Sequence, residues 1–126
     1  MLKGLMGATI WSEDLNKLLP FYRDVLGLSI AYEMPEFVGF GERADGGGYT
    51  GAYLGLGTHS EVKGAVKDPY RHMVGLDSDD VDGDYDRLRE AGVEFIDAPT
   101  NYGELRIATL KDPEGNLVQL LQMVGE

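Results

Sequence analysis

The sequence of 126 residues contains no cysteine, only two histidines and half as many basic as acidic side chains. The lack of cysteine excludes disulfides, zinc–thiolate sites, iron–sulfur clusters and thiol nucleophiles. No apolar run reaches the length of a membrane span, and the first residues lack the layout of a signal peptide. We therefore expect a cytoplasmic protein.

Basic side chains are scarce, with eleven Lys and Arg against 22 Asp and Glu and a net charge of −11. The excess of acid is larger in the second half of the chain, residues 64–126, than in residues 1–63. A negative field repels phosphate backbones and anionic lipid, so nucleic acid and membrane surfaces are poor partners. The same field attracts cationic ligands, although an acidic surface that only maintains solubility has the same composition.

Apolar residues make up 43% of the chain and charged residues 26%, which is typical of one soluble globular domain with a buried core. Glycine is abundant, at 18 residues, about twice its usual share. The glycines show no collagen-like period. They indicate many short strands joined by tight turns, or backbone that something approaches closely.

Two successive segments show the same order of elements. In the first we predict a strand over 5–11, a helix over 15–26 that Pro20 bends, and strands over 28–33, 36–42 and 49–56. In the second we predict a strand over 70–76, a helix over 81–91, and strands over 93–96, 105–110 and 117–123.

A shift of 65 residues places Gly27 on Gly92 and Asp14 on Asp79, which indicates an internal duplication. The predicted fold class is α+β, with two βαβββ modules at about 1–60 and 68–126 within a single domain. We expect the two curved mixed sheets to form a bowl, with the helices on its outer face.

Three segments carry a resemblance to a known family: FYRDVLGL (21–28), LREAGV (88–93) and KDPEGNLVQL (111–120). In this order they resemble the vicinal-oxygen-chelate superfamily, which includes glyoxalase I, extradiol dioxygenases, epimerases, fosfomycin-modifying enzymes and bleomycin-resistance proteins. The resemblance covers nearly the whole chain. It implies paired βαβββ modules that form a bowl, usually completed in a homodimer.

The resemblance also implies four positions at which family enzymes hold a divalent metal. They fall on Gly7 and Gly55 in the first module and on His72 and Gln119 in the second. Glycine has no ligating side chain and an amide is a weak ligand, so we expect no metal and no cofactor. His59 or Glu61 could swing in to rebuild a site, but nothing in their spacing indicates it.

The remaining candidates have several interpretations. His72 is a vestigial ligand position, a general base or a structural polar residue. Gln119 alternates with Val118 and Leu120, so it should face the bowl, where it would bond a ligand or His72.

Aromatic side chains offer walls for a ligand. Gly7, Tyr53 and Gly55 should point the same way, as should Thr9 and Trp11, and the glycines would leave room for a bound molecule. The alternative is that the aromatic rings fill the bowl or pack at a dimer seam. A further set is interpreted as core rather than as a ligand groove: Tyr32, Phe37, Phe40 and Tyr49.

Two charged features remain. The acidic stretch 77–86 resembles a calcium loop only superficially, and we interpret it as a solvated helix N-terminus. Arg106 would pair with Glu104 or Asp97, or would clamp an anionic substrate.

The sequence thus predicts a metal-free small-molecule-binding protein that sequesters an aromatic or cationic compound in a cleft of a homodimer. The residues predicted to bind the ligand are Gly7, Thr9, Trp11, Tyr53, Gly55, His72 and Gln119. The first alternative is a metal-dependent lyase, isomerase or dioxygenase with a displaced site centred on His72. Two others are a metal-free enzyme with His72 as its base and a regulatory subunit without a small-molecule role.

Overall fold

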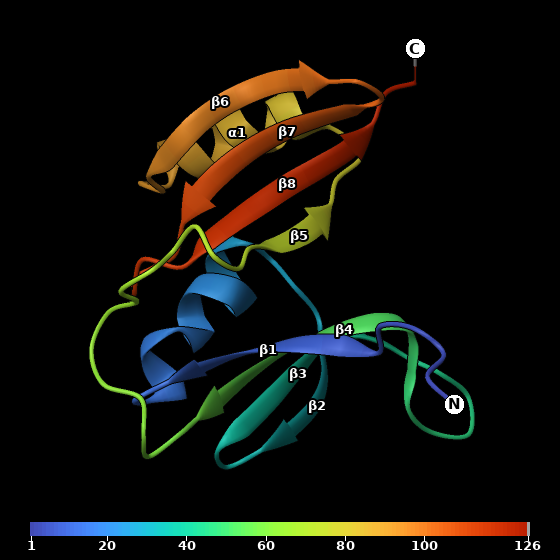
Figure 1. The fold of residues 1–126 in the computed structure, drawn as a ribbon, viewed down its shortest axis with the longest axis vertical. Helices are drawn as coiled ribbons and strands as arrows, with labels where there is room; N and C mark the ends of the chain where they lie inside the picture. Colours follow the sequence, from blue (N-terminus) through green and yellow to red (C-terminus); the bar gives the residue numbers. More distant parts are fainter. Residues whose placement is uncertain (126) are drawn as a thin grey trace. The chain divides into compact units, whose positions relative to one another are not determined.

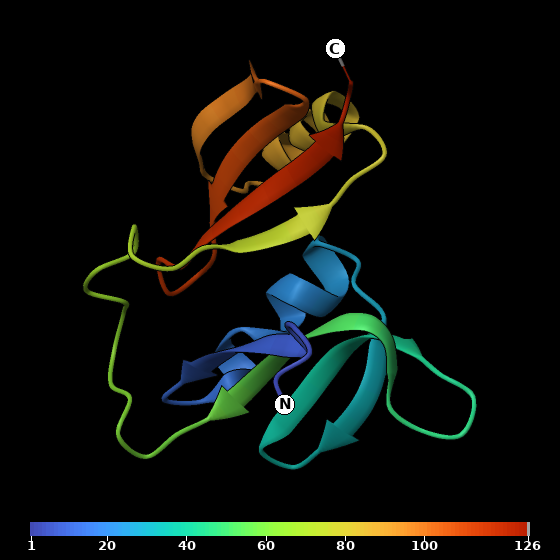
Figure 2. The same cartoon turned by 45° about the vertical axis from the view of Figure 1, so that its right-hand side comes forward.

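The structure of the protein is a computed structural model that describes residues 1–125. The chain divides into two compact units, Met1–Gly64 and Ala65–Glu126. Each unit holds a four-stranded mixed sheet with helical segments on one face (Figures 1 and 2). The predicted α+β class with two βαβββ modules is confirmed. No helix within the described residues is long and apolar enough to cross a bilayer.

The first unit has two short helical segments between its first and second strands. Its elements are β1 (Gly7–Ser12), η1 (Leu15–Lys17), η2 (Phe21–Val25), β2 (Ile30–Met34), β3 (Phe37–Arg43) and β4 (Tyr49–Thr58). The strand order is β1-β4-β3-β2, with β1 parallel to β4 and the other pairs antiparallel.

The second unit repeats this arrangement with one regular helix. Its elements are β5 (Val74–Asp77), α1 (Val81–Glu90), β6 (Phe95–Tyr102), β7 (Leu105–Lys111) and β8 (Leu117–Met123). The strand order is β5-β8-β7-β6, and α1 packs against β6, β7 and β8. The strand predicted over 70–76 is shorter than expected, because a turn precedes it in which the Arg71 N–H donates to the Asp68 carbonyl at 3.2 Å.

The continuous helix predicted over 15–26 is wrong in detail. A 3₁₀ turn is followed by a π-helical turn, which the Leu26 N–H closes by donating to the Phe21 carbonyl at 2.8 Å. Pro20 precedes the π turn with φ −60°. A π turn holds one more residue than an α turn, so the segment keeps its ends in place while accommodating an extra residue.

The helix starts show which residues of the two units correspond. The Asp14 N–H donates to the Ser12 hydroxyl at 3.1 Å, and the Asp80 N–H donates to the Ser78 hydroxyl at the same distance. Asp80, and not Asp79 as the sequence shift predicted, is therefore the counterpart of Asp14. Thirteen positions separate Asp14 from Gly27 and only twelve separate Asp80 from Gly92, so the π turn holds the extra residue.

One face of the first sheet is buried beneath its helical segments. The buried apolar side chains on this side are Leu15, Leu18, Leu19, Tyr22, Val38, Phe40, Leu54 and Leu56. Successive residues of a strand point to opposite faces. The residues that alternate with Val38 on β3 and with Leu54 and Leu56 on β4 therefore lie on the other face, away from the core.

Candidate functional site

The face of the first sheet that points away from the core brings the predicted residues of the first module together. The parallel register of β1 and β4 sets Gly7 opposite Tyr53, Thr9 opposite Gly55, and Trp11 opposite Gly57. Residues directly opposite one another share a face of the sheet. The predicted common orientation of these residues is confirmed.

The glycines do not leave open space as we expected, because aromatic rings lie over them. A Cβ atom added at Gly55 would sit 2.7 Å from Cζ of Phe37. A Cβ at Gly7 would meet the ring of Tyr53. Glycine in a strand permits this close approach because nothing projects from its Cα.

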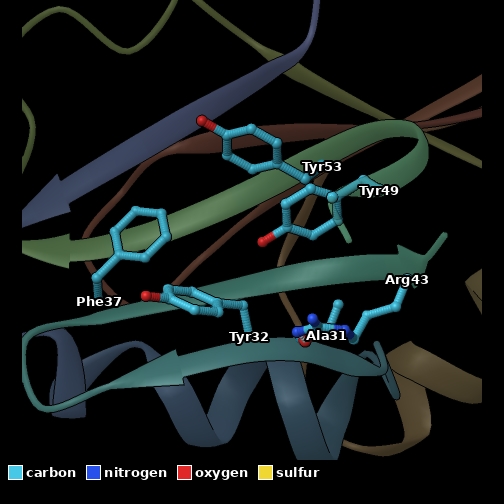
Figure 3. A pocket seen from close by; sticks show the side chains of 7 residues that line it. Ala31, Tyr32, Phe37, Arg43, Tyr49 and Tyr53 are labelled. Carbon is cyan, nitrogen blue, oxygen red and sulfur yellow. Dashed lines mark hydrogen bonds between the residues drawn. The ribbon is translucent and has the colours of Figure 1, made fainter. Parts of the chain in front are cut away.

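Four aromatic rings wall a pocket of about 340 Å³ on the first unit (Figure 3). The lining residues are Ala31, Tyr32, Phe37, Arg43, Gly48, Tyr49 and Tyr53. The pocket volume lies in the range of sites that bind small molecules. It is the strongest candidate for a functional site within the first unit.

The rings come from three strands. Tyr49 and Tyr53 lie side by side on β4, with ring centroids 4.7 Å apart and planes inclined by 25°. Tyr32 comes from β2 and Phe37 from β3. Burial raises the pKa of the Tyr49 phenol above its ordinary value. Like any protonated phenol, its hydroxyl can donate a hydrogen bond.

The interpretation of the β2–β4 aromatic residues as core is wrong for three of the four. Phe40 is in the core, 3% exposed, with its ring 6.4 Å from that of Tyr22. Tyr32, Phe37 and Tyr49 line the pocket instead. Phe37 and Phe40 lie an odd number of positions apart on one strand, so they must face opposite ways, and this signal was present in the sequence.

Three residues of the pocket lining were not predicted from the sequence, Ala31, Gly48 and Arg43, and Arg43 is the charged one. It ends β3 directly opposite Tyr49 of β4, and its Nη1 donates to the Ala31 carbonyl at 2.9 Å. Ala31 sits at an irregularity in the β2–β3 pairing, between Ile30 and Tyr32. Strand ends and bulges are poorly marked in a sequence, so no pattern pointed to this cation.

His72 and Gln119 both belong to the second unit. His72 is exposed and precedes β5, outside the strand in which it was predicted, and no hydrogen bond joins it to Gln119 in the described part of the chain. Gln119 is half-buried on β8 between the buried Val118 and Leu120, so its predicted alternation is confirmed.

Arg106 has a partner that the sequence did not reveal. Its Nε and Nη2 each donate to a carboxylate oxygen of Asp82 at 2.8 Å, and its Nη1 donates to Asn101 at 2.9 Å. The expected pairing with Glu104 or Asp97 is wrong, because Asp82 on helix α1 takes that place. The two hydrogen bonds from Arg106 lower the pKa of Asp82 below its ordinary range.

The acidic stretch 77–86 contains the start of helix α1, as predicted. The Asp80 carboxylate accepts a hydrogen bond from the Gly83 N–H at 3.0 Å and caps the helix. Asp84, in the first turn, accepts from the Ser78 hydroxyl at 2.7 Å. Acidic side chains at this end complement the helix dipole.

The chain matches the model of the Glyoxalase/Bleomycin resistance protein/Dioxygenase superfamily over residues 5–120. It belongs to this superfamily. The superfamily resemblance seen in the sequence is thereby confirmed.

Two relatives match over most of their length. YraH of Bacillus subtilis is 31% identical over 122 residues, covering 88% of this chain and 91% of YraH. A probable lactoylglutathione lyase of Vibrio cholerae is 29% identical over 119 residues, covering 86% and 83% of the two chains. Among solved structures, TnmS3, an antibiotic-binding protein from Streptomyces sp. CB03234, is 25% identical with a TM-score of 0.72, covering 97% of each chain.

The strand registers revise one of the four superfamily metal positions. Thr9 pairs with Gly55 in the first unit, and Gly75 pairs with Gln119 in the second. Gly7 precedes Thr9 by two residues, so its counterpart is the residue two before Gly75, which is Met73. Counting back seven residues from Asp80 gives the same answer.

The residues at these positions do not fit the divalent metal of the superfamily enzymes. Gly7 and Gly55 are covered by rings, Met73 carries a soft thioether, and Gln119 is an amide. Across residues 1–125, no three His, Cys, Asp or Glu side chains are grouped so that they could hold a metal ion.

His59 and Glu61, which were considered as replacement ligands, are engaged locally. The Glu61 N–H donates to Nδ1 of His59 at 3.0 Å, and the His59 ring meets Trp11 edge-on at 5.4 Å between centroids. Nδ1 of His59 is thus occupied as an acceptor. These contacts hold His59 beside Trp11, and Glu61 belongs to no group of three His, Cys, Asp or Glu side chains among the described residues that could hold a metal ion.

Proposed function

We propose that this protein binds a flat aromatic small molecule, without a metal, in the ring-walled pocket of its first unit. The observation that carries the proposal is the set of four aromatic rings around a pocket of about 340 Å³. Flat apolar walls with phenolic tips suit a planar ligand, because they stack on its faces and bond its polar edge.

Two further observations support the proposal. The superfamily positions that hold a metal in enzymes carry two glycines, a methionine and a glutamine in this chain. TnmS3, which matches the whole fold, is described as an antibiotic-binding protein. A protein that only binds its ligand needs a pocket that matches the ligand in shape and polarity, and it needs no catalytic group.

We further propose that the protein works as a cytoplasmic homodimer and avoids nucleic acid. The net charge of −11 supports the last point, because it repels phosphate. Trp11 and Thr9 lie on the same face as the pocket residue Tyr53 and are proposed as secondary contacts for larger ligands. Light scattering of the purified protein tests the dimer, and a monomer would contradict it.

Calorimetric titration with a panel of planar two- and three-ring compounds tests the binding proposal. Tyr32→Ala and Tyr49→Ala should each weaken binding about three- to tenfold, as expected for the loss of one stacking ring. Tyr102→Ala is the matched control, because Tyr102 is 61% exposed on β6 and lies outside the pocket lining. Equal losses in all three variants, or no binding by any planar compound, would contradict the proposal.

A metal-dependent lyase is the second candidate, because probable lactoylglutathione lyases are 26–29% identical to this chain over most of its length. Elemental analysis of protein purified without chelators, together with an assay of S-lactoylglutathione formation, separates the two. A stoichiometric divalent metal with turnover would replace the binding proposal.

A further inference from the structure

Arg43 is the only charged residue among the described residues that line the pocket. The rest of the lining consists of four aromatic residues, an alanine and a glycine, with no carboxylate among them. The protein as a whole is strongly acidic, with twice as many acidic as basic side chains. The described lining therefore carries one positive charge and no negative charge, unlike the chain as a whole.

The other arginines are engaged with side-chain partners. Four of them pair with aspartates: Arg23 with Asp24, Arg71 with Asp68, Arg87 with Asp84, and Arg106 with Asp82. The guanidinium of Arg89 lies 5.2 Å above the ring of Tyr85. All six arginines lie within the described residues, and only the guanidinium of Arg43 has neither an ion pair with a carboxylate nor an aromatic ring beneath it.

One hydrogen bond orients the Arg43 side chain and leaves most of its donors available. Nη1 donates to the Ala31 carbonyl at 2.9 Å, and Ala31 itself lines the pocket. A guanidinium carries five N–H donors in a planar fork that matches a carboxylate. Figure 3 shows Arg43 and Ala31 at one end of the group of rings.

We propose that the pocket selects planar aromatic acids, with the ring system against the aromatic side chains of the lining and an anionic oxygen on the ligand hydrogen-bonded to Arg43. This inference rests on the proposed function and narrows its ligand class. It differs from the aromatic or cationic ligand that the sequence predicted. The rings alone would suit a cation over their faces, but Arg43 places a like charge in the same lining.

Three naphthalene probes of nearly equal shape test this selectivity by calorimetry: 2-naphthoate, 2-naphthamide and 2-naphthylmethylammonium. The naphthoate should bind about five- to tenfold more tightly than the amide, a modest factor because Arg43 is exposed to solvent. The ammonium compound should bind most weakly. Raising the salt concentration should narrow the difference between naphthoate and amide.

Variants assign the preference to Arg43. Arg43→Gln should remove the preference for naphthoate over the amide, and Arg43→Lys should keep part of that preference. Arg89→Gln is the matched control, since it removes a guanidinium of the second unit and should leave all three affinities unchanged.

The results with the three probes distinguish failure of the proposed selectivity from failure of the proposed binding function. Amide binding that equals or exceeds naphthoate binding would overturn the selectivity and leave the aromatic pocket standing. Tightest binding of the ammonium compound would replace the anion site with an aromatic cage for cations. Failure of all three probes to bind would overturn both proposals.

Discussion

Glycine and aromatic residues act in pairs on the open face of the first sheet. Tyr53 lies over Gly7, Phe37 over Gly55 and Trp11 over Gly57. Each ring covers the backbone of its glycine, which has no side chain of its own to cover it. Because the glycine lacks a Cβ, the ring can lie close against the strand. The unusual glycine content seen in the sequence is thus partly explained by close approach of side chains as well as by turns.

This pairing predicts a cost for adding a single methyl group. Gly55→Ala should destabilise the protein by about 1–3 kcal/mol, because the new Cβ would press on the Phe37 ring at 2.7 and 2.8 Å and on the Thr9 hydroxyl at 2.9 Å. It should also weaken ligand binding, because Phe37 is a pocket wall. Urea unfolding and calorimetric titration measure the two effects.

Gly75→Ala is the control for this change. Its added Cβ would meet mainly the flexible end of Leu121, at 2.6 Å from Cδ1, so the side chain can move away. We expect a loss of less than about 1 kcal/mol and unchanged binding. If Gly75→Ala lowered the free energy of unfolding as much as Gly55→Ala, the loss at Gly55 could not be attributed to the ring packed on that glycine.

The residue scale also shows where prediction from sequence stops. The common face of Gly7, Thr9 and Trp11 on β1 followed from strand alternation, which is a local rule. Arg43 could not be found in this way, because its place in the pocket depends on pairing between β3 and β4. Long-range register is not written in local periodicity.

At the scale of elements, the helix starts were predictable and the helix interior was not. Ser12 and Asp14 cap the first helical segment with polar side chains that sequence rules recognise. The same pattern of apolar residues fits an α-helix or a π turn. The extra residue before Gly27 is therefore revealed only by the hydrogen bonds of the structure. The one-residue error in aligning the two modules, and hence the choice of His72 over Met73, follows from it.

An ion pair between Asp82 of helix α1 and Arg106 of β7 joins the helix to its sheet. This pair predicts that the stability of the protein depends on pH. Arg106 lowers the pKa of Asp82, so the pair contributes stability above the ordinary carboxyl pKa of about 4, and this is lost as pH falls through the lowered value. Asp82→Asn should lower Tm by about 1–3 °C at pH 7, and the difference should vanish in acid. Thermal melts between pH 2 and 8 measure it.

Asp86→Asn provides the comparison for this prediction. Asp86 is exposed on the same helix, and no ion pair joins it to another described residue. Its removal should change Tm little at any pH in the series. If both variants gave the same pH profile, the effect would come from net charge and not from the Arg106–Asp82 pair.

The whole molecule repeats one architecture with two different surfaces. The helix of each unit is tied to the last strand in the same manner, by Thr58 to the Leu15 N–H and by Gln122 to the Val81 N–H. The fold class was predictable because it depends on the order of elements and their caps, which duplication preserves. The site was not, because the two modules have diverged at the positions that the superfamily uses for metal.

The side chains at the superfamily metal positions predict how the stability of the protein responds to divalent metals. A protein that binds a metal at a hundred times its dissociation constant gains about 2.7 kcal/mol of stability, which would raise Tm by roughly 5–15 °C in a chain of this size. With Gly7, Gly55, Met73 and Gln119 at the superfamily positions, we expect Zn²⁺, Mn²⁺, Ni²⁺ or Fe²⁺ to shift Tm by less than about 1 °C. Scanning calorimetry with each metal and with a chelator measures the shift. A metal-dependent rise in Tm would show that other residues build a metal site.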